Sequence, residues 1–242
     1  MARTIYSLFT GLLLTALLAS CEIDNFDRPD AEFFGAIKDS VGGTLVETEL
    51  INGSVIQAYE LGYPTQVAQN WVIKNNGEFR NNLVFPGKYD IFFRNGNFFP
   101  YTISGLEIKP GQNQRDFLVV PYLRIKNSSI THDKAANKIV ATFTLEAGKP
   151  NVKAKAVRLY AFSDIYVGEY VKFNTAGTGF TQSFNPSKVI DTSTYTLSID
   201  LAANTNFFKA GRNYYFRIGA LADVAGVGTI RHNYAPNVKI TL

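Results

Sequence analysis

From Glu32 onward, the chain consists of short apolar and aromatic runs that are separated by turn residues at close intervals. Three of these turns are Asn75-Asn76-Gly77, Pro86-Gly87 and Asn95-Gly96-Asn97, and Asn and Gly are the residues that best tolerate a positive φ. Apolar residues do not recur at the 3.6-residue spacing of an amphipathic helix. Because short strands divided by turns are typical of a sandwich or barrel, the sequence predicts an all-β fold.

Two β-domains are predicted, with a boundary at Val120-Pro121-Tyr122, because proline interrupts a strand ladder. Residues 31–121 would form the first domain and residues 122–242 the second. A strand is expected over residues 98–103 of the first domain. Phe98 and Phe99 would then lie on opposite faces of one sheet, so that one of them would be exposed unless a second layer covers it.

The second domain shows the clearest alternation. In residues 138–145, Ile139, Ala141, Phe143 and Leu145 would share one face, and residues 156–162, 195–201 and 213–220 alternate in the same way. About seven such strands predict an immunoglobulin- or fibronectin-like sandwich, in which Tyr214 or Tyr215 would be the corner tyrosine. In the last of these strands, Tyr215 and Arg217 would lie opposite the apolar face.

The N-terminal 20 residues are predicted to be a signal peptide. Arg3 precedes an uncharged apolar run over residues 8–18, which is too short to span a bilayer, and small residues follow the run. Cys21, the only cysteine of the chain, comes directly after these small residues, so no internal disulfide can form. The acidic, proline-containing residues 22–30 would be a tether.

Leu18-Ala19-Ser20-Cys21 resembles the bacterial lipobox, in which the cysteine thiol is acylated and becomes the first mature residue. This resemblance implies that residues 21–30 link a lipid anchor to the first domain and that the protein does not span the membrane. The acidic residues after Cys21 resemble the surface-export signal of Bacteroidetes lipoproteins, which implies an outer-membrane protein facing the cell surface. The alternative is an ordinary signal peptide that a cysteine follows by chance.

The first domain resembles the prealbumin-like modules related to carboxypeptidase regulatory domains. The resemblance depends on Gly35-x-Ile37-x-Asp39, Asn76-Gly77-x-Phe79 and Phe85-Pro86-Gly87-Lys88-Tyr89, and it implies that Tyr89 packs inward. The whole chain, from lipobox to sandwich, resembles a Bacteroidetes lipoprotein family of unknown function that is associated with SusC/SusD-type nutrient importers. That resemblance implies a role beside such a transporter pair in the outer membrane, and it brings no catalytic residues.

The residues give little sign of an enzyme. No Gly-x-Ser-x-Gly or phosphate-binding loop occurs, and the two histidines, His132 and His232, stand in polar, loop-like sequence. Carboxylates such as Glu169 fit loops or solvent-facing strand positions. The formal net charge of +4 is spread along the chain without a basic run, which argues against nucleic-acid binding. We therefore expect no catalytic residues, no metal and no cofactor.

Aromatic side chains are the remaining candidates for a binding site, because sugar rings stack on exposed aromatic faces. The leading hypothesis is an accessory subunit of an importer that captures a polysaccharide or oligosaccharide. The alternatives are a structural subunit that binds no ligand and an accessory to a peptide importer. The candidate ligand-binding residues are Tyr59, Tyr63, Trp71, Phe98, Phe99, Tyr101, Tyr166 and Tyr170.

Overall fold

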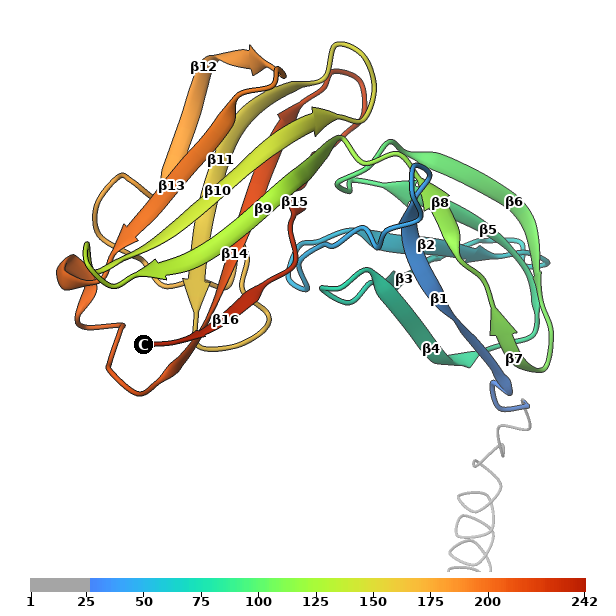
Figure 1. The fold of residues 1–242 in the computed structure, drawn as a ribbon. Coiled ribbons are helices and arrows are strands. Elements are labelled where there is room, and N and C mark those ends of the chain that lie inside the picture. The colour runs from blue at the N-terminus through green and yellow to red at the C-terminus, as the bar shows by residue number, and fades with distance from the viewer. Residues whose placement is uncertain (1–26) are drawn as a thin grey trace, which may run out of the picture.

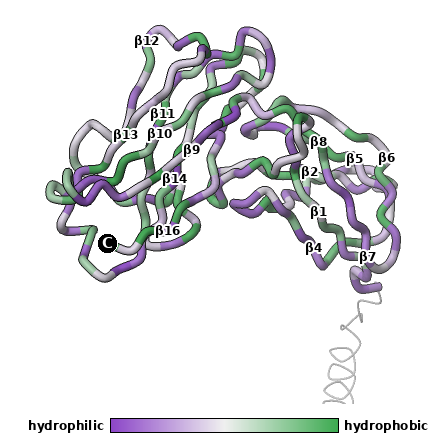
Figure 2. The backbone as a smooth tube through the Cα atoms, viewed as in Figure 1, coloured by the Kyte–Doolittle hydropathy of each residue, from purple (hydrophilic) through white to green (hydrophobic). Residues whose placement is uncertain are grey.

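The computed structural model describes residues 27–242, so the predicted signal peptide and Cys21 lie outside the described residues. The fold is built of strands, with one short 3-10 helix at Ala202–Asn204, which confirms the all-β prediction. Two sandwiches lie side by side, with β1–β8 in one and β9–β16 in the other (Figure 1). Figure 2 shows hydrophobic segments alternating with hydrophilic ones along the strands of both.

The first domain packs two sheets together. One has the order β4-β1-β7, with β8 also pairing to β1, and the other has the order β3-β2-β5-β6. β1 pairs antiparallel to β4 and parallel to both β7 and β8. The bounds are β1 Ala31–Asp39, β2 Val55–Glu60, β3 Ala68–Val72, β4 Glu78–Val84, β5 Gly87–Arg94, β6 Tyr101–Ile108, β7 Gly111–Gln114 and β8 Phe117–Val119.

Aromatic rings fill the core of the first domain. The ring centroid of Phe33 lies 5.5 Å from that of Trp71 and 5.4 Å from that of Phe79. Tyr89 is buried, as the prealbumin-like resemblance implies, and its hydroxyl donates to the carbonyl oxygen of Phe85 at 2.7 Å. This hydrogen bond holds the Pro86-Gly87 turn against β5, the strand that follows it.

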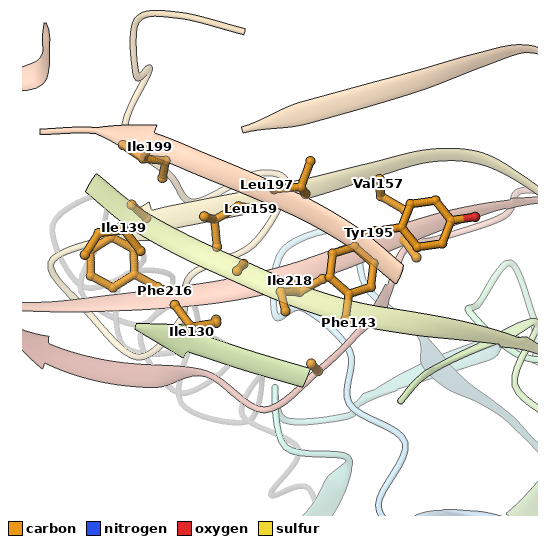
Figure 3. Packing of buried hydrophobic residues seen from close by; sticks show 14 of the residues in the cluster. Ile130, Ile139, Phe143, Val157, Leu159, Tyr195, Leu197, Ile199, Phe216 and Ile218 are labelled. Carbon is orange, nitrogen blue, oxygen red and sulfur yellow. The ribbon is translucent and has the colours of Figure 1, made fainter. Parts of the chain in front are cut away.

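The second domain also has two sheets, β13-β10-β9 and β12-β11-β14-β15, and β16 pairs with β14. The predicted inward face of residues 138–145 is confirmed, since Ile139, Ala141, Phe143 and Leu145 are all buried, and Figure 3 shows this core from close by. The bounds are β9 Leu123–Asp133, β10 Lys138–Ala147, β11 Lys153–Phe162, β12 Thr181–Val189, β13 Thr194–Asp200, β14 Asn213–Asp223, β15 Asn233–Tyr234 and β16 Val238–Thr241.

Tyr214 is the corner tyrosine of the second domain. Its ring is buried, and its hydroxyl accepts the backbone N–H of Lys209, five residues upstream, at 2.8 Å. Tyr215, the other candidate, is only half-buried. This backward hydrogen bond is the arrangement found in immunoglobulin-like sandwiches.

The strand expected over residues 98–103 is corrected in part, because β6 begins at Tyr101 and continues to Ile108. Phe98 forms only an isolated bridge with Pro121 and lies in the first core. Phe99 points to the other domain, where its ring centroid lies 4.9 Å from that of Tyr122 and 4.1 Å from Nζ of Lys149. Phe98 is therefore covered by its own domain, and the second domain supplies the layer that half-buries Phe99.

Candidate functional site at the domain junction

Arg217 of β14 is the centre of the contact between the two domains. Its side chain is fully buried, and Nη2 donates to Oε2 of Glu47 at 2.5 Å and to the carbonyl oxygen of Asn75 at 3.0 Å. Nη1 donates to the carbonyl oxygen of Thr48 at 2.8 Å. All three acceptors belong to the first domain. Alternation places Arg217 on the outer face of its sheet as expected, but the first domain covers that face.

The same guanidinium holds two segments of its own domain. Nη1 donates to the carbonyl oxygen of Val167 at 3.2 Å, and Nε donates to that of Ala235 at 3.0 Å. The guanidinium carbon also lies 4.2 Å from the ring centroid of Tyr234, within cation–π range. All five N–H donors of Arg217 thus have an acceptor. Arg217 therefore links the first domain to residues 163–172 of the second, which we call the junction loop.

A second charged cluster, formed within the second domain, holds the junction loop through Glu169. Nη1 of Arg158 lies 2.9 Å from both carboxylate oxygens of Glu169, and the hydroxyl of Tyr160 donates to Oε2 at 2.7 Å. Burial by itself would raise the pKa of Glu169, but the hydrogen bond from Tyr160 and the neighbouring cations lower it overall. The backbone N–H of Glu169 donates to the hydroxyl of Tyr234 at 3.1 Å. Glu169 thus lies in a loop, one of the two settings expected for it, but its side chain is half-buried and paired rather than free in solvent.

Tyr166 and Tyr170 are displayed on this anchored loop, with 41% and 52% of their surfaces exposed. The N–H of Tyr170 donates to Oε2 of Glu49 at 3.1 Å, and Nη1 of Arg231 lies 3.5 Å from the hydroxyl of Tyr170. Oε1 of Glu49 and Nε of Arg231 are buried and have no hydrogen-bond partner among the described residues. These two atoms lie beneath the surface beside an exposed, fixed tyrosine, and the Glu49 carboxyl also interacts with the hydroxyl of Tyr234.

Exposed apolar side chains extend this surface across both domains. Leu50 and Ile51 follow Glu49 directly, and Ile165 belongs to the junction loop. The carbonyl oxygen of Ile165 accepts from Nδ2 of Asn75 at 3.3 Å, so the first domain also holds this end of the loop. We define the junction surface as Leu50, Ile51, Ile165, Tyr166 and Tyr170. It combines rigid apolar area with polar groups, as carbohydrate recognition requires.

The other predicted aromatics lie elsewhere. Tyr63 is exposed in the β2–β3 loop, and Tyr59 is half-buried on the outer face of its sheet against Phe92. Tyr101 is half-buried and stacks on Phe93 at 4.6 Å between centroids. The structure does not bring these three together with Tyr166 and Tyr170.

The predictions for Trp71 and Phe98 are corrected, because both side chains are buried in the first core. Alternation along β3 turns Trp71 inward, where its ring packs between those of Phe33 and Tyr89. Phe99 is half-buried against the second domain. None of these three rings offers a free face for a sugar.

A cleft of about 410 Å³ also lies between the domains, and Leu45, Arg124 and Tyr234 are among its lining residues. Its principal charges already satisfy one another. Arg124 donates to both carboxylate oxygens of Asp39, at 2.5 and 2.8 Å, and to Oε1 of Glu146 at 3.0 Å. We therefore place the candidate site at the junction surface, where Tyr166 and Tyr170 are exposed, rather than in this cleft.

His232 lies outside the strands, as expected, but its ring is half-buried and lies against those of Tyr160 and Tyr234, at 6.2 and 6.0 Å between centroids. His132 instead lies within β9, which corrects its expected loop-like setting. In residues 27–242, no group of three or more His, Cys, Asp or Glu side chains is arranged to hold a metal ion. No helix within the same residues has the length and apolarity needed to cross a bilayer.

Burial of His232 leads to a prediction on pH. Burial lowers the pKa of His232 from 6.5 to about 4, so the unfolded chain binds a proton in this range that the native protein does not. The free energy of unfolding should therefore fall by about 3 kcal/mol, from this group alone, as the pH is lowered from 6.5 toward 4. His232→Gln should remove this part of the slope in urea-unfolding measurements.

The pH dependence of stability must be compared between wild type and His232→Gln, because Glu47 and Glu49 change the free energy of unfolding in the opposite direction to His232. Burial raises the pKa of both carboxyls, so the free-energy cost of keeping them ionised in the folded protein is relieved as the pH falls. The difference between wild type and His232→Gln cancels these contributions. Parallel pH profiles for the two proteins would contradict the prediction.

The fold and the junction define a class of two-domain β-sandwich protein in which a buried arginine locks the second domain onto the first. Residues 33–120 match the model described as the N-terminal domain of a protein of unknown function (DUF3823), and residues 123–239 match its C-terminal domain model. The chain belongs to the DUF3823 family.

Solved structures agree with this assignment. A crystal structure from Bacteroides uniformis ATCC 8492, described as a "putative carbohydrate binding protein", is 49% identical with a TM-score of 0.85, covering 88% of this chain and 100% of that one. A DUF3823 family protein from Parabacteroides merdae ATCC 43184 is 22% identical with a TM-score of 0.69, covering 89% of this chain and 100% of that one. The second likeness shows the fold alone. No curated protein matches the chain.

Proposed function

We propose that this protein binds a polysaccharide or oligosaccharide at the junction surface. The observation that carries the proposal is the pair of exposed tyrosines, Tyr166 and Tyr170, on a loop that buried charges hold in place. Fixed rings lose little conformational entropy when a ligand binds, which favours affinity. The carbohydrate-binding description of the 49%-identical Bacteroides protein supports the same ligand class.

The proposal includes a location and a partner. Acylation of Cys21 would anchor the protein to the outer membrane, with the domains at the cell surface, and the family resemblance supports a place beside a SusC/SusD-type importer. Its contribution would be to raise the local concentration of glycan at the transporter through multivalent binding. It would add no catalytic step.

The test is titration of the chain from Asp24 against a panel of polysaccharides and peptides. We expect at least one glycan to bind, and Tyr170→Ala to weaken that binding about tenfold or more, equivalent to about 1.4 kcal/mol or more. Tyr170→Phe should lose less, because it keeps the ring and removes only the contact with Arg231. Tyr63→Ala is the matched control, since Tyr63 is 61% exposed, against 52% for Tyr170, but lies in the first domain's β2–β3 loop.

Two results would contradict the glycan assignment, and a third would contradict the site. Binding of peptides alone would favour a peptide importer. Co-purification with a transporter pair without binding of any ligand would favour a structural subunit. An equal loss of glycan binding in the Tyr63 and Tyr170 variants would remove the junction surface as the site.

A further inference from the structure

One end of the first domain carries exposed apolar side chains next to the point where the tether enters. The strand register places Ala31, the first residue of β1, opposite Val84 at the end of β4 and Gly111 at the start of β7. The end of β2 pairs with the start of β5 through Glu60 and Tyr89. The entering chain and the β2–β3, β4–β5 and β6–β7 loops therefore lie at the same end (Figure 1).

We define the proximal rim as the four large apolar residues exposed in these loops and at the end of β4, namely Tyr63, Val67, Leu83 and Phe85. Leu83 is 73% exposed and Val67 is 72% exposed. Exposed apolar groups at one end of a soluble domain are typical of a surface that contacts a partner or a membrane. Tyr63 is also of a residue type that is enriched at membrane interfaces.

The length of the tether favours a membrane, rather than a partner protein, as what the rim contacts. The N–H of Gly111 donates to the carbonyl oxygen of Asp30 at 3.0 Å, so the chain is fixed to the sheet from Asp30 onward. The nine residues from Glu22 to Asp30 span at most about 30 Å when fully extended. An acylated Cys21 would hold the rim within that distance of the bilayer.

We infer that the proximal rim inserts into the headgroup region of the membrane that holds the Cys21 acyl chains. This inference rests on the anchor in the proposed function. The contact is mainly apolar, because the exposed Arg28, Lys88 and Lys109 at this end alternate with the exposed Asp30 and Glu107. Binding should therefore change little with salt concentration.

Rim insertion would set the orientation of the candidate glycan site. Asn75 and Glu47, which contact Arg217, lie beyond the opposite ends of the same strands, since Ala36 pairs with Glu78 at the start of β4. A rim resting on the bilayer would place the junction surface at the end of the first domain that faces away from the lipid. The sugar site would then be open to the medium.

The test uses the mature chain with Cys21→Ser and vesicles of phosphatidylethanolamine and phosphatidylglycerol. We expect weak flotation of this unanchored protein with the vesicles, largely independent of salt, and a loss of about tenfold or more in Leu83→Ser/Phe85→Ser. Val41→Ser/Leu118→Ser is the matched control, because both residues are exposed and lie at the other end of β1 or on its partner β8. Leu83→Ser alone should show part of the loss if the double variant does not fold.

Equal flotation of the rim and control variants, or no flotation of the unanchored protein, would overturn the inference. Mass spectrometry of the native protein tests the anchor separately. An acylated Cys21 together with an inactive rim would remove this inference and leave the proposed function standing. A bare thiol would remove the anchor, whatever the vesicle result.

Discussion

Replacing Arg217 with methionine should lower the free energy of unfolding by about 3–5 kcal/mol, because removal of one partner leaves the other buried and uncompensated. Among the described residues, Arg217 is the one cation that pairs with Glu47, and the carbonyl oxygens of Thr48, Val167 and Asn75 would each lose a donor. Methionine is flexible enough to occupy the space left by the guanidinium stem. The loss would therefore be mainly polar, and urea unfolding followed by fluorescence of the single Trp71 would measure it.

The position of Arg217 gives this substitution a second consequence. Three of its five hydrogen bonds go to the first domain, so the two sandwiches should unfold separately in Arg217→Met. Calorimetry should then show two transitions where the wild type shows one. Arg212→Met is the matched control, since Arg212 is exposed in the same domain, and it should change stability by less than about 0.5 kcal/mol. A loss below about 1 kcal/mol in Arg217→Met would contradict the role assigned to the guanidinium.

Strand faces were predictable from the sequence because a strand has a period of two whatever packs against it. Ile139, Phe143 and Tyr214 turn inward as their alternation requires, and the turn at Pro86-Gly87 fixes Tyr89 in the first core. Two of the candidate ligand-binding residues, Tyr166 and Tyr170, are exposed because they lie in a loop with no alternating neighbours.

The junction could not be predicted, because alternation says which face a side chain occupies and not what covers that face. Arg217 occupies the outer face of β14, and the acceptors that bury it lie 169 and 170 residues away at Thr48 and Glu47. Phe99 is covered in the same way by the second domain. The only local hint was a charge within the otherwise apolar run of β14, and such a charge is equally compatible with solvent.

The same limit explains the unpaired atoms at the candidate site. Glu49 and Arg231 stand in polar sequence, yet both flank Tyr170 once the domains are joined. The surroundings of Tyr170 come from three separate segments, namely the junction loop and those that carry Glu49 and Arg231. Neither its neighbours in sequence nor its residue type therefore distinguish it from Tyr63. A binding surface assembled across a domain boundary is visible only in three dimensions.

Replacing Cys21 with serine should move the protein from the membrane fraction to the soluble fraction of native cells. Serine keeps the small size of the side chain but removes the thiol that the lipobox resemblance requires for acylation. Each buried methylene contributes about 0.8 kcal/mol, and two or three acyl chains together hold a protein stably. We expect nearly complete membrane association of the wild type and nearly complete loss of it in the variant, as measured by ultracentrifugation of lysed cells.

Ser20→Ala is the control for this experiment, because it keeps a small residue before the cysteine and should leave the protein anchored. Mass spectrometry of the mature N-terminal peptide should find lipid on Cys21 in both the wild type and the control. An unlipidated wild type, or a Cys21→Ser protein that stays with the membrane as firmly as the wild type, would contradict the anchor. Weak residual association of Cys21→Ser that Leu83→Ser abolishes would instead come from the proximal rim, because that side chain is exposed where the tether meets the first domain.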